Sequence, residues 1–125
     1  MSEIGTIDTI ARALIADLPA GWREVKGVYR STTPYAELDA TVDGAQLEPL
    51  PDGLEDHFEA LRRKMYQPGK GTWLTASISV TSDGHFATDF DYETEPAWSM
   101  PVDAGIYAAE LAEFPRDDVP GWMRG

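Results

Sequence analysis

Thiol and imidazole groups, the usual ligands of zinc and other transition metals, are few in this sequence. It has no cysteine, and its two histidines are His57 and His85. These belong to different expected elements, so a two-histidine metal site would need a tertiary approach that nothing in the sequence indicates. We therefore expect no metal, no cofactor and no thiolate chemistry.

Asp89 and Asp91 form the candidate pair for carboxylate chemistry. They alternate along an expected strand, where His85 shares their face, and such a set could bind a hard cation or act as acid and base. Nothing apolar flanks the pair on that face to raise the pKa of one carboxyl group. A small hydrolase that uses these aspartates remains an alternative, but we expect that the chain is not an enzyme.

Gly69-Lys70-Gly71-Thr72 has a superficial likeness to a phosphate-binding loop. It lacks the G-x-x-x-x-G-K-[ST] spacing and precedes an expected strand, whereas a phosphate-binding loop opens a helix. The sequence also contains no G-x-S-x-G and no G-x-G-x-x-G. Nucleotide binding and serine-hydrolase chemistry are therefore not expected.

The charge of the chain restricts its partners. Its 125 residues include 22 acidic and 10 basic side chains, for a net charge of −12. Residues 83–118 hold ten of the acids and a single base, Arg116. Nucleic acids and anionic membranes repel such a surface, whereas a basic protein is attracted to it. Acidity also serves solubility alone, so the charge by itself identifies no partner.

Length and patterning indicate a single domain over residues 1–125. The hydrophobic content is 42%, and no linker or internal repeat divides the chain. Residues 1–5 lack the basic and apolar regions of a signal peptide, and no apolar run has the length of a membrane span. We expect a cytoplasmic protein, in agreement with the absence of cysteine.

Three segments have helical periodicity. The first covers residues 3–18, with Ser2 as its N-cap. The second has an apolar stripe and ends at about residue 66, and the third covers about residues 102–113 and is stopped by Pro115. The stripe of the second helix consists of Leu54, Phe58, Leu61 and Met65.

Five further segments are typical of strands. They are residues 22–30, 35–42, 45–50, 72–81 and 85–93, the third confined to an edge by Pro49 and Pro51. The expected fold is α+β, with a largely antiparallel sheet of four to five strands and about three helices packed mainly on one face. One layer of helices leaves the other face of the sheet bare.

The hairpin of residues 72–81 and 85–93 supplies the candidate site. If Val80 pairs with Phe86, one face of the hairpin is apolar and enters the core; it carries Leu74, Ala76, Ile78, Val80, Phe86, Phe90 and Tyr92. The opposite face carries the predicted partner-binding residues, which are Trp73, Thr75, Ser77, Asp89, Asp91 and Glu93. Trp73 is the expected apolar anchor, and the three carboxylates face a basic partner.

Two other interpretations of these residues stay open. In the first, the polar face is exposed to solvent and binds no partner, and Trp73 only covers the end of the sheet. Alternatively, the contact lies on the acidic C-terminal segment, around Asp103, Glu110, Glu113, Asp117 and Asp118.

The order of several features resembles that of the YezG-like immunity proteins of bacterial polymorphic toxin systems. The resemblance covers nearly the whole chain, and its most specific part is the hairpin W-x₁₀-G-x-F-x₃-F-x-Y that starts at Trp73. The other features are Leu18-Pro19 with Trp22 after an amphipathic helix, Asp83-Gly84-His85-Phe86, Asp89-Phe90-Asp91-Tyr92-Glu93, and Pro120 with Trp122. Glu37, Asp39 and Thr41 depart from the more aromatic strand expected there.

This resemblance implies a cytosolic protein that binds and neutralises the toxic C-terminal domain of a cognate secreted effector. In that family the toxin is often a nuclease; an NAD-consuming toxin or another toxic enzyme is the next alternative. The sequence leaves the oligomeric state open, and we favour a monomer in a 1:1 complex. An acidic inhibitor suits a nuclease, because the groove that binds phosphates must be cationic. A secretion chaperone or adaptor for an effector remains the alternative binding role.

Overall fold

The computed structural model describes residues 3–33 and 35–124. Its elements are α1 (Glu3–Ile15), β1 (Glu24–Thr32), β2 (Tyr35–Val42), β3 (Ala45–Gln46), α2 (Leu54–Lys64), β4 (Thr75–Thr81), β5 (Phe86–Asp91), the 3₁₀ turn η1 (Ala104–Ile106), α3 (Tyr107–Glu113) and η2 (Gly121–Met123). The predicted N-cap, Ser2, lies outside the described residues.

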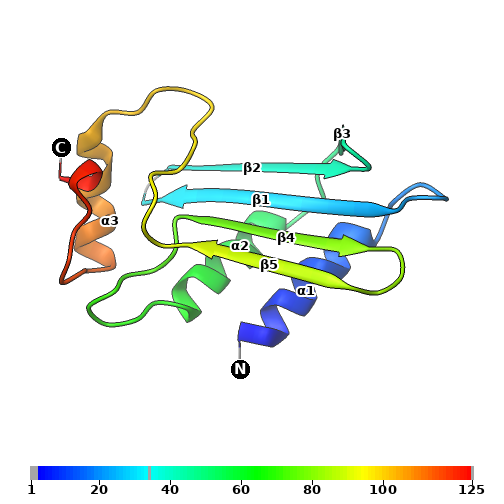
Figure 1. Ribbon diagram of the computed structural model, residues 1–125, viewed down its shortest axis with the longest axis horizontal. Coiled ribbons are helices and arrows are strands. Elements are labelled where there is room, and N and C mark those ends of the chain that lie inside the picture. The colour runs from blue at the N-terminus through cyan, green and yellow to red at the C-terminus, as the bar shows by residue number, and fades with distance from the viewer. Residues whose placement is uncertain (1–2, 34, 125) are drawn as a thin grey trace.

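The strands form one antiparallel sheet in the order β3-β2-β1-β4-β5. Figure 1 shows α1 and α2 together on one face of this sheet and α3 at the end of the sheet where β1 and β5 finish. The predicted α+β class, with an antiparallel sheet and helices mainly on one face, is confirmed.

Several elements are shorter than predicted. Helix α1 ends at Ile15, because the chain turns there with the Leu18 amide donating to the Ile15 carbonyl at 3.5 Å. Strand β3 has two residues, since proline cannot continue a ladder of backbone hydrogen bonds. Residues 102–103 precede η1 without helical structure.

The turn between β2 and β3 is fixed by Asp43 and Gly44. Both have positive φ, 50° and 83°, as the two central residues of a type I′ hairpin turn require. The Asp43 carboxylate also accepts the amides of Arg23 and Glu24 at 2.8–3.2 Å, which ties the start of β1 to this turn.

The main core lies between the sheet and the helix pair. Phe58 of α2 is fully buried and stacks on Tyr29 of β1 with ring centroids 5.0 Å apart. Gly27 lies beside this stack, and a Cβ atom there would be 3.4 Å from both Leu14 methyl groups. The glycine therefore allows α1 to approach β1 closely.

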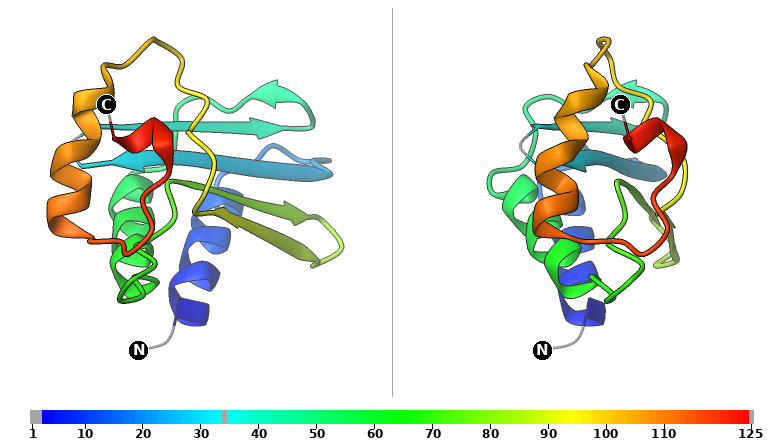
Figure 2. Two further views of the ribbon diagram at one scale, coloured as in Figure 1. Left: turned by 60° about the vertical axis from the view of Figure 1, so that its left-hand side comes forward. Right: turned by 90° about the vertical axis from the view of Figure 1, so that its left-hand side faces the viewer.

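A second apolar cluster, here called the C-terminal cluster, lies at the end of the sheet. Its buried residues are Leu74, Tyr107 and Met123, and its half-buried ones are Trp98, Val102, Ile106, Leu111, Val119 and Trp122. Seen from that end, α1 and α2 lie on one side of the sheet, while η2 and residues 93–101 lie on the other (Figure 2, right). The C-terminal cluster is thus separate from the core under α1 and α2 and includes segments on the opposite side of the sheet.

Phe86 does not enter the core, so that part of the hairpin prediction is wrong. Its side chain is 57% exposed, although its strand partner Val80 is buried. The alternation of the strand is as expected, because Phe90 packs against the main core from the same side of β5. Phe86 is the first residue of β5, at the edge of the sheet.

Helices long and apolar enough to cross a bilayer do not occur among the described residues.

Replacing Phe58 by alanine should lower the free energy of unfolding by about 3–5 kcal/mol, because a buried ring is lost and a cavity is left. Phe86→Ala is the matched control, with an expected loss below about 1 kcal/mol. Urea unfolding followed by circular dichroism measures both. Similar losses in the two variants would contradict the burial of Phe58.

Candidate functional site

The sheet face opposite α1 and α2, here called the open face, carries most of the predicted site. Its residues are Lys26, Val28 and Arg30 of β1; Glu37, Asp39 and Thr41 of β2; Thr75, Ser77 and Ser79 of β4; and Ala87, Asp89 and Asp91 of β5. Charged and hydroxyl side chains predominate among these residues, so the open face is polar.

The register across this face agrees with the predicted hairpin. Thr75 is opposite Asp91 and Ser77 is opposite Asp89. Directly opposite side chains on one sheet face have Cβ atoms about 4.5–5.5 Å apart. The structure therefore brings these four predicted residues onto one surface.

Sequence reasoning missed the charges that β1 and β2 add to the same surface. Arg30 donates to Asp39 at 2.9 Å, and its Nη1 atom lies 3.8 Å from the Glu37 carboxylate. Two carboxylates surround one guanidinium group, so the net charge of these three side chains is negative. Strand parity was the available signal, since Glu37 and Asp39 alternate along β2 as Asp89 and Asp91 do along β5.

Trp73 does not lie on the open face, and its prediction as an exposed anchor is wrong. The side chain is fully buried in the main core, where it packs edge-on against Tyr29 and contacts Phe90. The indole therefore contributes to stability and is not accessible to a partner.

A local break in strand parity explains this error. Thr75 is the register partner of Asp91, yet the amide of the preceding Leu74 also donates to the Asp91 carbonyl, at 2.9 Å. Two successive residues opposite one is the arrangement of a β-bulge, which interrupts the alternation of side chains. Leu74 accordingly enters the C-terminal cluster, and Trp73 enters the main core.

Asp91 and Glu93 also differ from their predicted roles as simple surface charges. The Asp91 carboxylate accepts the amides of Glu93 and Thr94 at 3.0 and 2.9 Å, so it closes the turn that ends β5. Partial burial acts to raise the pKa of Asp91, but these amide hydrogen bonds prevail and lower it. Glu93 is exposed beyond the strand, opposite no residue of β4.

Residues after β5 cover one end of the open face. Figure 1 shows this segment passing β1 and β2 before α3 begins. Ser99 donates its amide and its hydroxyl to the Glu37 carboxylate, the hydroxyl at 2.7 Å, and Trp98 packs on Tyr35 with centroids 5.2 Å apart. The uncovered part of the face therefore centres on Val28, Ser77 and Asp89.

Tyr107 fixes the start of this covering segment. Its hydroxyl donates to Glu95 at 2.6 Å and accepts the Trp98 indole N–H at 3.0 Å. Burial, followed by the hydrogen bond to Glu95, raises the pKa of Tyr107 to about 12. The tyrosine is therefore a neutral donor at ordinary pH, and it joins α3 to residues 95–98.

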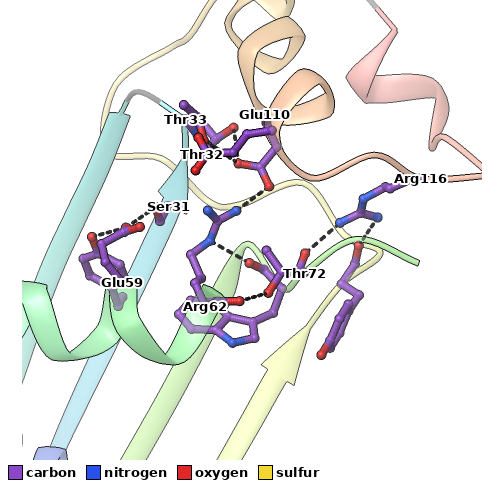
Figure 3. Close-up of polar contacts among 12 residues, drawn as sticks. Ser31, Thr32, Thr33, Glu59, Arg62, Thr72, Glu110 and Arg116 are labelled. Atoms are coloured by element: carbon purple, nitrogen blue, oxygen red, sulfur yellow. Dashed lines mark hydrogen bonds and ion pairs between the residues drawn. The ribbon is translucent and has the colours of Figure 1, made fainter. Parts of the chain in front are cut away.

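A buried ion pair joins α3 to α2 (Figure 3). Arg62 donates to Glu110 at 2.5 Å, and the two side chains are 1% and 0% exposed. The Arg62 Nε also donates to the Trp73 carbonyl at 2.9 Å, while Glu110 accepts the Thr33 amide at 2.9 Å. Glu110 is thus no part of an acidic surface, contrary to the alternative interface considered from sequence.

The sequence contains a signal for this pair. Arg62 lies one helical turn after Phe58, and Glu110 lies three residues after Tyr107, so both occupy buried helix faces. A charged residue on an apolar stripe needs a buried partner.

The Gly69-Lys70-Gly71 segment is a tight turn packed against the C-terminal segment. A Cβ atom on Gly71 would be 2.6 Å from Arg116 Nε, and one on Gly69 would be 2.5 Å from an Asp117 carboxylate oxygen. Arg116 continues past the turn and donates to the carbonyls of Tyr92 and Thr72 at 2.6 and 2.9 Å. The two glycines therefore allow the backbone of this turn to pack closely against the side chains of Arg116 and Asp117.

The two histidines belong to separate parts of the structure. His57 lies on α2, whereas His85 lies on the exposed turn before β5 with its Nδ1 atom 3.1 Å from Asp83. Within residues 3–33 and 35–124, no group of three His, Cys, Asp or Glu side chains could hold a metal ion. The lowered pKa of Asp91 is opposite to what a general acid requires.

Comparison of the chain with protein-family models finds no match, and comparison with curated proteins finds none either.

Glu110→Gln should lower the free energy of unfolding by about 3–5 kcal/mol, because it leaves the Arg62 charge buried without its counter-ion. Glu113→Gln, one turn later on an exposed position, should change it by less than about 0.5 kcal/mol. Chemical denaturation of both variants measures the difference. Equal effects would show that the pair is not the main contact between α3 and α2.

The ionisation of Glu37 should make the stability of the folded protein depend on pH. Partial burial acts to raise the pKa of Glu37, but hydrogen bonds from Tyr35 and Ser99 and the charge of Arg30 outweigh it and lower the pKa. Its contribution is therefore complete above the unfolded-state pKa of about 4.3 and is lost as pH falls through the folded-state value.

Glu37→Gln should consequently melt below the wild type at pH 7, and the gap should narrow as pH falls from about 5 to about 2. Melting temperatures across that range test this. A gap of constant size would assign the loss to something other than ionisation of Glu37.

Proposed function

We propose that this chain is an immunity protein that binds and neutralises the toxic C-terminal domain of a cognate secreted bacterial effector. The observation that carries the proposal is the open face, a polar and acidic surface on a sheet whose other side is anchored by a packed core. Such a surface keeps its shape when a partner binds. The proposed activity is inhibition through binding, without catalysis by this chain.

The chemistry of the open face suits a basic protein. Asp39, Asp89 and nearby hydroxyl groups can accept hydrogen bonds from lysine or arginine side chains, and the net charge of −12 attracts such a partner at a distance. A nuclease presents a cationic groove to phosphates, so a nuclease domain is the favoured toxin, with an NAD-consuming enzyme next. The resemblance to YezG-like immunity proteins supports the same assignment.

The two alternatives predict different behaviour. A secretion chaperone or adaptor would bind a leader segment of an effector and leave its toxicity unchanged. A hydrolase using Asp89 and Asp91 would turn over a substrate without any partner. No specific structural observation favours a leader-binding role, and the second acid of the hydrolase pair, Asp91, is held in a turn by two backbone amides that lower its pKa.

Rescue of bacterial growth tests the proposal. This chain is co-expressed in the cytoplasm with the C-terminal domain of an effector encoded beside it, with both proteins quantified by immunoblot. We expect restored growth and a 1:1 complex with a dissociation constant of about 1 nM or lower, roughly −12 kcal/mol. Continued growth arrest with both proteins present would reject the immunity function.

A pair of charge variants locates the contact. Asp39→Lys with Asp89→Lys should weaken the complex at least about tenfold by repelling a basic partner from the open face. The matched control, Glu55→Lys with Asp56→Lys, makes the same charge change on exposed positions of α2. Equal weakening by the two pairs would show that only net charge matters, whereas wild-type binding by the first pair would place the interface elsewhere.

A further inference from the structure

The two edges of the sheet differ in how they are protected. The β3 edge has two residues and is followed by Pro49 and Pro51. The β5 edge is six residues long, from Phe86 to Asp91, and contains neither proline nor lysine. Short strands, proline and lysine are the usual means of blocking an edge against another strand. Strand β5 itself has none of them, although Lys70 from the turn before β4 lies near its C-terminal end, with Nζ 4.8 Å from the Tyr92 ring centroid.

Half of the backbone amides of β5 point away from the sheet. The Asp91 carbonyl accepts from Leu74 and the His85 carbonyl accepts from Thr81, so the odd-numbered residues direct their backbone groups toward β4. In an antiparallel strand the intervening residues then direct theirs outward. These are Phe86, Thr88 and Phe90, at the terminal position of the sheet.

The side chains beside this edge have two chemistries. On the helix side lie Phe86, which is 57% exposed, the exposed Thr88, and Phe90, which is half-buried. On the open face lie Asp89 and Asp91. A strand added alongside β5 would therefore meet apolar rings on one of its faces and carboxylates on the other.

We infer that the free edge of β5 is a strand-addition site for an extended segment of a basic partner protein in which apolar and basic residues alternate. Backbone hydrogen bonds to Phe86, Thr88 and Phe90 hold the segment. Its basic side chains meet Asp89, and its apolar side chains cover Phe86. The inference rests on the proposed function for the nature of the partner and adds the mode of contact.

A second copy of this chain is the less suitable occupant. Each copy carries a net charge of −12, so association of two copies brings together like-charged surfaces. A basic segment reduces that charge, and its lysine or arginine side chains replace repulsion beside β5 with hydrogen-bonded ion pairs.

A backbone substitution separates this site from the open face as a whole. In Thr88→Pro the ring removes an amide that points outward and blocks a neighbouring strand, while the hydrogen bonds to β4 are retained. Thr88→Val keeps the amide and is the matched control. Circular dichroism and thermal melting establish that both variants are folded.

The probe is a synthetic peptide in which lysine and valine alternate, long enough to span β5, with a glutamate–valine peptide as the charge control. We expect the lysine peptide to bind the wild type and Thr88→Val and to bind folded Thr88→Pro at least about tenfold more weakly. In amide hydrogen exchange it should protect Phe86, Thr88 and Phe90. The glutamate peptide should not bind.

Three results would overturn the inference: no binding of the lysine peptide, equal binding by folded Thr88→Pro, or protection confined to residues other than those three. A homodimer that Thr88→Pro abolishes would also overturn it, by making the second copy the occupant. Growth rescue separates the two proposals. Rescue by a Thr88→Pro variant that has lost peptide binding rejects the edge site and keeps immunity, whereas peptide binding without rescue by the wild type rejects immunity alone.

Discussion

Arg62 and Glu110 face one another where neither side chain reaches solvent, so the protein itself must supply every polar partner that water would otherwise provide. Those partners come from three regions that are distant in sequence: the end of β1, the residues before β4, and α3. The chain can satisfy the pair only when all three are in place. Through this requirement, a short C-terminal helix acquires a defined position against a sheet that it covers only at one end.

The β-bulge at Leu74 and Thr75 makes a second connection between the same parts. It sends Leu74 to the C-terminal cluster and Trp73 to the main core, so successive residues join two separate apolar clusters. The residues that follow in β4 then alternate regularly, with apolar side chains toward the helices and hydroxyl groups on the open face. Through this one bulge, the sheet packs against the C-terminal cluster at one end, while the rest of its open face stays polar.

Patterns that depend on neighbours in sequence were predictable. Alternation predicts a strand over residues 35–42, with the observed bounds, and the β4–β5 register follows from alternation and a tight turn. Features that depend on distant contacts were not: the bulge needs the Asp91 carbonyl, and the burial of Glu110 needs Arg62. The exposure of Phe86 likewise follows from its tertiary position, at the start of the edge strand of the sheet. Four of the six predicted site residues therefore share the open face, while Trp73 does not.

The open face contains two kinds of position, which differ in their freedom to vary. Asp91 closes a turn and Thr75 belongs to the bulge, so substitutions there disturb the backbone. Val28, Ser77 and Asp89 belong to neither apolar cluster, and their replacement leaves the packing of the fold intact. Because most proteins lie close to their stability threshold, positions of the second kind are where new specificities can accumulate over evolution without loss of the folded state.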